Sequence, residues 1–288
     1  MINDFQVPVF GTLSGFLKFF AWLAMVIFNL CFFRENEEQL SFVSRMVLKA
    51  KPWKRYRLVK NLCVILEIMA LASLYFFPTT IGISLPLARL ANLGNINYFA
   101  TPIFAPFIVM IPVALLSISP LKHLDLYAQA YPAALVFLKI ACFVQGCCNG
   151  MEMDSGMYNY DTGLIEFPIQ LLEAGIAILM MFALIVYRKK TKHVGTVMPL
   201  YMIIYSVQRF IIQFFRADYP DVIIGLDGYQ LFSIGTIILG IIEWILVVKL
   251  APKSKFLMEG IKYKPIEDFC NGIPFPKKEK KVADGNNE

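Results

Sequence analysis

The sequence predicts an all-α membrane protein, a polytopic bundle of seven transmembrane helices with its N-terminus outside and its C-terminus inside. Hydrophobic residues make up 58% of its 288 residues and charged residues only 17%, which is more apolar than a soluble domain of this length tolerates. Seven apolar segments approach the roughly 20 residues that a spanning helix needs. Basic residues gather in the connections on one side of these segments. These observations predict the class, the number of spans and the orientation.

The predicted spans are seven apolar stretches separated by polar connections. They cover residues 9–33, 61–78, 101–119, 124–145, 166–187, 197–216 and 229–250. The second is short, and the third contains Pro102, Pro106 and Pro112. Prolines are tolerated in spanning helices where neighbouring groups satisfy the freed carbonyls. We therefore expect a kinked helix at the third position.

The distribution of positive charge sets the orientation, because Lys and Arg gather on the cytoplasmic side of spanning helices. Residues 34–60, Lys122, residues 188–192 and residues 249–281 hold most of the 27 basic residues. All of them fall on one side if every predicted span crosses the membrane. The net charge of +6 is therefore a topology signal, and we expect no nucleic-acid partner. We expect residues 1–250 to form the transmembrane domain and residues 251–288 a basic cytoplasmic tail, disordered at its end.

Polar side chains inside the apolar spans are the candidate functional residues. Arg209, Gln213 and Arg216 occupy positions i, i+4 and i+7, which share one face of a helix. Charged side chains in hydrocarbon are costly and usually mark a functional site. Two guanidiniums on one face must line a cavity, pair with buried acids or hold an anion.

Other spans carry matching polar groups near the predicted outer ends. Glu166, Gln170 and Glu173 again fall at i, i+4 and i+7, with Pro168 placed in the first turn of the helix. The remaining outer members are Lys139 and Gln230; Asp125 shares the helical face of Lys139 but lies at the inner end of that span. These groups predict a polar cavity in the outer leaflet. The alternative is that they form interhelical ion pairs, such as Glu173 with Arg209, that only fix the bundle.

Three of the six cysteines, Cys142, Cys147 and Cys148, cluster after the fourth predicted span. Thiolates bind zinc, but neither His123 nor His193 lies near them in the sequence. We therefore expect no metal site and no cofactor. Two of the three thiols could instead form a disulfide in an oxidising exterior, or all three could simply pack.

Four sequence blocks, in order, resemble the bacterial prolipoprotein diacylglyceryl transferase family. They are residues 125–150, residues 167–173 (F-P-I-Q-L-L-E), residues 205–216 (Y-S-V-Q-R to F-F-R) and residues 230–234 (Q-L-F-S-I). The family has H-P-S-Q-L-Y-E in the second block, Y-x-x-x-R-x-x-x-E-x-x-R in the third and G-Q-x-L-S in the fourth. The resemblance covers roughly residues 100–250.

The chain departs from the family pattern at several positions. The family motif R-x-G-N-F-x-N-G-E corresponds to residues 139–147, so Lys139 replaces an arginine and Cys147 replaces an acid. Gln213 stands where the family has a glutamate. The family's H-G-G block, whose histidine is a proposed base, has no counterpart in residues 98–107. The resemblance therefore favours the binding geometry more than the chemistry.

The resemblance implies transfer of a diacylglyceryl group from phosphatidylglycerol to the lipobox cysteine of a preprolipoprotein, in the bacterial cytoplasmic (inner) membrane. Implied partners are phosphatidylglycerol, or another anionic phospholipid, and the prolipoprotein signal peptide. Candidate catalytic residues are Arg209, Lys139 and Glu173, and candidate substrate-binding residues are Arg216, Gln170, Gln213, Gln230, Gly146, Gly150 and Tyr205. The thiol needs a base, for which Glu173, Glu166 and Asp125 are the candidates.

Two other functions remain open at the level of sequence. A divergent member of the family would bind anionic phospholipid, or act on another acceptor, without prolipoprotein transferase activity; the missing histidine favours it. A transporter needs polar residues through the inner half of the membrane or broken helices near its middle. Here the inner half is mostly apolar, apart from Asp125 and Glu243.

Overall fold

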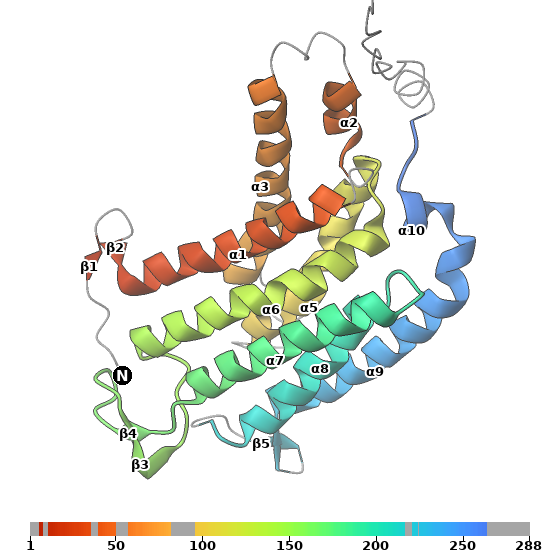
Figure 1. Cartoon of the computed structure of the whole chain (residues 1–288). Helices are drawn as coiled ribbons and strands as arrows, with labels where there is room; N and C mark the ends of the chain where they lie inside the picture. The colour runs from red at the N-terminus through yellow and green to blue at the C-terminus, as the bar shows by residue number, and fades with distance from the viewer. Residues whose placement is uncertain are drawn as a thin grey trace, which may run out of the picture.

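The protein is mostly helical (Figure 1). The computed structural model describes residues 6–7, 11–35, 40–49, 57–81, 96–216, 221–223 and 225–263. Its helices are α1 (Leu13–Glu35), α2 (Phe42–Lys49), α3 (Arg57–Ile81), α5 (Ile96–Leu115), α6 (Pro120–Gln145), α7 (Ile169–Lys190), α8 (Val197–Gln213), α9 (Gly228–Leu250) and α10 (Lys255–Glu259), with a 3-10 turn at Ala251–Lys253. The prediction of an all-α class is confirmed.

The strands form small antiparallel pairs in the connections between helices. They are β1 (Gln6–Val7) with β2 (Gly11–Thr12), β3 (Glu152–Tyr158) with β4 (Ile165–Glu166), and β5 (Asp221–Ile223) with β6 (Leu226–Asp227). Each pair is too short to make a core of its own. They serve to shape the connections.

Each predicted span contains one long helix, and four of these helices are apolar and long enough to cross a membrane. Within the described residues, these four segments are Leu13–Cys31, Pro120–Gln145, Ile169–Lys190 and Gly228–Lys253. Many large apolar side chains of α7 and α9 are exposed, including Leu179, Phe182 and Ile238, as expected of surfaces that face lipid tails. The protein is therefore a multi-pass membrane protein.

Two helix ends differ from the prediction. Helix α7 begins at Ile169 with Pro168 as its N-cap, because the residue before a proline is restricted to extended backbone and the chain cannot enter the helix earlier. Glu166 therefore lies in β4, and its predicted place on the helical face of Glu173 is wrong. Helix α8 ends at Gln213, so Arg216 follows the helix instead of belonging to it.

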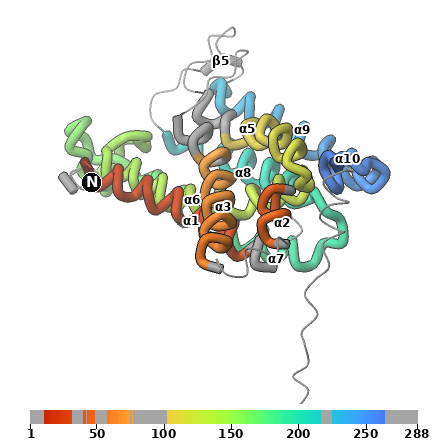
Figure 2. Tube along the Cα trace, turned by 90° about the horizontal axis from the view of Figure 1, so that it is seen from above, coloured from red at the N-terminus to blue at the C-terminus, as the bar shows by residue number. Residues whose placement is uncertain are grey.

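Helix α6 is the centre of the bundle and packs against α1, α5, α7 and α8. Figure 1 shows α1, α6, α7, α8 and α9 running alongside one another, and Figure 2 shows α1 and α6 side by side. The backbones approach closely because small side chains line α6: Ala128, Ala130, Ala134 and Ala141 are fully buried. Four tyrosines fill the space between α6 and α8; their rings stack within each helix and meet edge to face between the helices: Tyr127, Tyr131, Tyr201 and Tyr205.

The bundle has two distinct ends, at opposite sides of Figure 1. The hairpin end, defined by β3, β4 and the helix termini Gln145, Ile169, Gln213 and Gly228, holds most of the candidate site residues. The α10 end contains the start of α6 and the end of α9, and there the Ile261 N–H donates to the Ala114 carbonyl at 2.9 Å. The chain after residue 250 thus folds back onto the bundle; the tail beyond residue 263 lies outside the described part.

Candidate functional site

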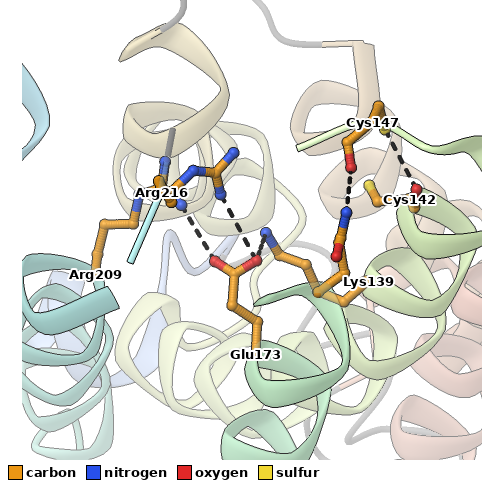
Figure 3. A network of polar contacts seen from close by, with 7 residues as sticks. Lys139, Cys142, Cys147, Glu173, Arg209 and Arg216 are labelled. Atoms are coloured by element: carbon orange, nitrogen blue, oxygen red, sulfur yellow. Dashed lines mark hydrogen bonds and ion pairs between the residues drawn. The ribbon is translucent and has the colours of Figure 1, made fainter. Parts of the chain in front are cut away.

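Three cationic side chains converge on one buried carboxylate at the hairpin end (Figure 3). The Lys139 Nζ lies 2.5 Å from Glu173 Oε2, the Arg209 Nη1 lies 3.1 Å from Oε1, and the Arg216 Nη1 lies 3.8 Å from Oε2. The four residues come from α6, α7, α8 and the turn after α8. We call them the cationic cluster. The predicted convergence of Lys139, Arg209 and Glu173 is present in the structure, and so is the ion pair of Glu173 with Arg209 that the bundle-fixing alternative predicts.

The cationic cluster carries two more positive charges than negative ones. Glu173 is only 2% exposed, and the side chains of Lys139, Arg209 and Arg216 are 14%, 10% and 4% exposed. An unbalanced buried charge is costly. One cation would be enough to balance the charge of Glu173. Within these four residues, Glu173 supplies one negative charge against three positive charges. A bound anion with several oxygen acceptors, such as a phosphate, would complement this excess.

Aromatic and amide groups border the cationic cluster. The Arg209 guanidinium lies over the Tyr229 ring, 4.8 Å from its centroid, a cation–π contact that holds the side chain in place. Tyr205 is buried one turn before Arg209 and stacks on Tyr201. Tyr229 is the member of this group that the sequence patterns did not single out, since an aromatic residue at a helix start is common at membrane interfaces.

Gln213 and Gln170 bring free polar atoms to the same region. Gln213 is 5% exposed, and among the described residues neither its Oε1 nor its Nε2 has a hydrogen-bond partner. The Gln170 Nε2 donates to the Cys147 carbonyl at 2.7 Å, while its Oε1 has no partner in the described part of the chain. Buried amides are normally hydrogen-bonded. These atoms are suited to contact a polar ligand.

Gln230 has a structural partner at the start of α9. Its Oε1 accepts from the Asp227 N–H at 3.1 Å, and its own N–H donates to Asp227 Oδ1 at 2.8 Å. This reciprocal arrangement is a capping box, which satisfies the first free N–H groups of a helix. A direct contact between Gln230 and substrate stays a prediction.

Gly146 and Gly150 let the connection after α6 pass close to its neighbours. Gly146 ends α6 in the left-handed conformation (φ 73°), and a Cβ there would lie 2.6 Å from Asp161 Oδ2. A Cβ on Gly150 would lie 2.2 Å from the Phe167 carbonyl oxygen. Any side chain at either position would displace the connection. Both predicted site glycines are thus packing requirements of this end of the bundle.

Backbone hydrogen bonds join the connection after α6 to both neighbouring segments. Gly150 forms an isolated antiparallel bridge with Arg216, and the Met151 N–H donates to the Phe215 carbonyl at 2.9 Å. The Phe167 N–H donates in turn to the Met151 carbonyl at 2.9 Å. These bonds fix the turn that carries Arg216. They explain how Arg216 reaches Glu173 although it follows the end of α8.

None of the three acids considered as a base is free. Glu173 is held by the three cations. Glu166 accepts from Asn159 Nδ2 at 3.0 Å and from Thr162 Oγ1 at 2.6 Å within the β3–β4 hairpin. Asp125 lies at the α10 end, where its carboxylate accepts from backbone N–H groups at the start of α8. The structure therefore brings together Lys139, Glu173, Arg209 and Arg216, and leaves Asp125 and Glu166 out of the cationic cluster.

The three clustered cysteines border the cationic cluster. Among the described residues, the sulfurs of Cys142, Cys147 and Cys148 all lie within 4.8 Å of one another. Hydrogen bonds from the Cys142 and Cys147 thiols lower the pKa of the Cys148 thiol well below its ordinary value, and the charges of Lys139 and Arg216 lower it further. Sequence spacing indicated a cluster here but not that all three sulfurs converge, because that depends on the turn after Gly146.

Comparison with known proteins identifies the family. Residues 40–246 match the model of the prolipoprotein diacylglyceryl transferase family. The chain belongs to this family. It is 34% identical over 128 residues to a phosphatidylglycerol–prolipoprotein diacylglyceryl transferase of Clostridium tetani, a match that covers 42% of this chain and 51% of the relative.

Other members of the diacylglyceryl transferase family show the same extent of similarity. A phosphatidylglycerol–prolipoprotein diacylglyceryl transferase of Idiomarina loihiensis is 35% identical over 137 residues, which cover 44% of this chain and 51% of the relative. The protein of Clostridium perfringens named phosphatidylglycerol–prolipoprotein diacylglyceryl transferase 2 is 32% identical over 129 residues. This match covers 42% of this chain and 50% of the relative. The chain spans about half the length of the curated relatives it matches.

Proposed function

We propose that this protein transfers a diacylglyceryl group from phosphatidylglycerol to the lipobox cysteine thiol of a preprolipoprotein. The observation that carries the proposal is the cationic cluster, whose excess positive charge suits a lipid phosphate. Membership of the transferase family supports the same reaction. In this reaction the cysteine sulfur forms a bond to the terminal glyceryl carbon, the bond from that carbon to the phosphate oxygen breaks, and glycerol phosphate leaves as the thiol loses its proton.

Each residue of the site has a proposed role. Arg209 and Lys139 hold the phosphate and stabilise the negative charge that grows on it as it leaves. Arg216 orients the headgroup at the rim. Glu173 keeps the three cations at fixed positions, and the free amide atoms of Gln213 and Gln170 contact the glycerol or the phosphate. The remaining predicted site residues, Gly146, Gly150, Tyr205 and Gln230, shape and support these contacts.

The proposed orientation places the hairpin end outside and the α10 end in the cytoplasm of a bacterial inner-membrane protein. Basic residues at the α10 end support it: Lys122, Arg188, Lys189, Lys190, Lys192, Lys249, Lys253 and Lys255. Seven crossings, the N-terminus outside and the C-terminus inside are consistent with the seven long helices in the described part of the chain. Residues 1–250 then form the catalytic membrane domain, and residues 251–288 the cytoplasmic segment.

The test is a transfer assay with the full chain in phosphatidylglycerol vesicles and a lipobox peptide, read as the mass gained by the peptide. We expect the wild type to modify the peptide and Arg209→Ala to lower the rate by at least ~100-fold, the size expected when a charge-stabilising group is removed. Lys189→Ala, an exposed cation at the α10 end, is the matched control and should keep its rate. Complementation of a bacterium depleted of its own transferase gives the cellular readout.

Two results would contradict the proposal in different ways. Wild-type turnover by Arg209→Ala would remove this residue from the reaction. Binding of phosphatidylglycerol by the wild type without modification of the peptide, in a well-folded preparation, would assign the protein to lipid binding or to another acceptor.

A further inference from the structure

The turn after α6 brings three thiols into one group at the edge of the cationic cluster. Cys142 lies in the last turn of α6, Gly146 ends the helix, and the Cys147 N–H donates back to the Cys142 carbonyl at 3.1 Å. Cys148 then takes a positive φ of 63°, which is uncommon for a residue with a side chain. The chain therefore folds Cys147 and Cys148 back over the helix end that carries Cys142.

The separation of the three sulfurs is close to that of a zinc–thiolate site. All three Sγ atoms lie within 4.8 Å of one another. Sulfurs at tetrahedral positions about 2.3 Å from a zinc ion lie ~3.8 Å apart, so a contraction of about 1 Å or less completes the set. Cys147 is exposed and the other two are half-buried, which gives an ion access from the surface.

The charges around the thiols favour a negatively charged metal–thiolate group. The Lys139 ammonium interacts electrostatically with the thiols of Cys142 and Cys148, and Figure 3 places Cys142 and Cys147 beside Lys139. Three thiolates around a divalent cation carry a net charge of −1. That charge lies next to a cluster with an excess of positive charge, so each stabilises the other.

The site also needs a means of activating a thiol. The only histidines of the chain, His123 and His193, lie at the α10 end, and Glu173, Glu166 and Asp125 are engaged in other contacts. A zinc ion with three protein ligands keeps its fourth position open in catalytic sites and holds a bound thiol as the thiolate. Such an ion would activate an acceptor thiol without a free base.

We propose that Cys142, Cys147 and Cys148 bind one Zn²⁺ ion whose fourth position takes the acceptor thiol. This proposal rests on the proposed function for the identity of the fourth ligand, and it replaces the expectation of a metal-free site. The acceptor thiol binds the zinc as thiolate and releases its proton to solvent. Its sulfur then forms the bond to the glyceryl carbon as the carbon–oxygen bond to the phosphate breaks, and the resulting thioether, a weak ligand, leaves the ion.

The first test measures metal in the purified full chain, produced with zinc in the growth medium. We expect about one zinc ion per chain, by elemental mass spectrometry, as three thiolates at one centre predict. Cys142→Ser, Cys147→Ser and Cys148→Ser should each lose most of it, whereas Cys63→Ser, a half-buried thiol on α3, should keep it. Elution of each variant as a single species shows that loss of zinc is not loss of fold.

Three results of this measurement would overturn the metal site. They are a chain without stoichiometric zinc, a chain that takes up copper but not zinc, and a triple Cys→Ser variant that keeps the full amount of zinc. A disulfide among the three cysteines, seen as the loss of two hydrogen masses in the non-reduced chain, would replace the metal site with a redox pair.

The second test addresses the open position. With Co²⁺ in place of zinc, thiolate ligands give charge-transfer absorption in the near ultraviolet, and a lipobox peptide should shift these bands while its Cys→Ser version should not. No shift would contradict a role for the fourth position. Metal content is measured without any transfer reaction, so the two proposals can fail separately. Transfer by a zinc-free chain would refute the zinc proposal alone. A zinc-loaded chain that transfers nothing would refute the proposed function alone.

Discussion

Glu173 and Asp125 are both buried carboxylates of the central helices, but they are neutralised in different ways. Glu173 is 2% exposed and faces three side-chain cations at the hairpin end. Asp125 is 5% exposed and accepts hydrogen bonds from the N–H groups of Gly195, Val197 and Met198 at 2.6, 2.9 and 3.2 Å. Both carboxylate oxygens of Asp125 thus accept hydrogen bonds from backbone N–H groups at or just before the start of α8. Glu173 instead faces three cations, and the proposed anion site depends on this excess of positive charge.

Of the two carboxylates, Glu173 should have the larger effect on the reaction, tested with Glu173→Gln. The variant removes the common counter-charge, so the three cations repel one another and lose their alignment. We expect transfer to fall by roughly 100-fold, as when a preorganised electrostatic group is disrupted, while binding of phosphatidylglycerol is not weakened because the net positive charge has increased. Equal loss of binding and turnover would instead make Glu173 a purely structural anchor.

Asp125→Asn should affect stability and leave the reaction intact. The amide keeps one acceptor oxygen but loses the charge that strengthens three hydrogen bonds, so we expect a loss of about 2–3 kcal/mol in the free energy of unfolding. Thermal denaturation in detergent measures this loss, and the transfer rate of the folded fraction should stay within about twofold, since effects at distant, independent sites add. A selective fall in turnover would show that the two ends of the bundle are coupled.

Gly150→Ala should give a smaller effect, confined to the hairpin end. The new methyl group would lie 2.2 Å from the Phe167 carbonyl oxygen, so the bridge between Gly150 and Arg216 must shift. We expect transfer to fall by about tenfold through displacement of Arg216. Gly175→Ala on α7 is the matched control, because a Cβ there meets no atom within 4 Å. It should leave transfer unchanged and add about 0.5–1 kcal/mol of stability; equal effects of the two changes would contradict this account.

The sequence predicts the helices well because their apolar stretches are long. Each expected span contains a helix, and α5 runs through Pro102, Pro106 and Pro112 as expected of a membrane helix. The ends are less predictable, since they depend on local backbone: Phe167 before Pro168 delays α7 and removes Glu166 from the helical face. Arg216 lies near Glu173 because a bridge to Gly150 directs the turn after α8.

Helical spacing predicts which candidate side chains converge, but it does not predict contacts that depend on tertiary structure. Lys139, Glu173 and Arg209 converge because each lies on an inward helix face. The capping contacts of Asp125 and Gln230, and the meeting of three cysteine sulfurs, join groups whose partners no periodicity reveals. Asp125, for example, bonds to residues 70 to 73 positions later in the chain.

The most direct test of the central claim compares the binding of phosphatidylglycerol, which is anionic, with that of phosphatidylethanolamine, which is zwitterionic, by native mass spectrometry of the detergent-solubilised chain. The excess charge of the cationic cluster predicts that the wild type binds phosphatidylglycerol at least ~10-fold more tightly, because one additional partly buried ion pair is worth at least this factor. Arg209→Ala should lose this preference and Lys189→Ala should keep it. Equal affinity of the wild type for the two lipids would contradict the account.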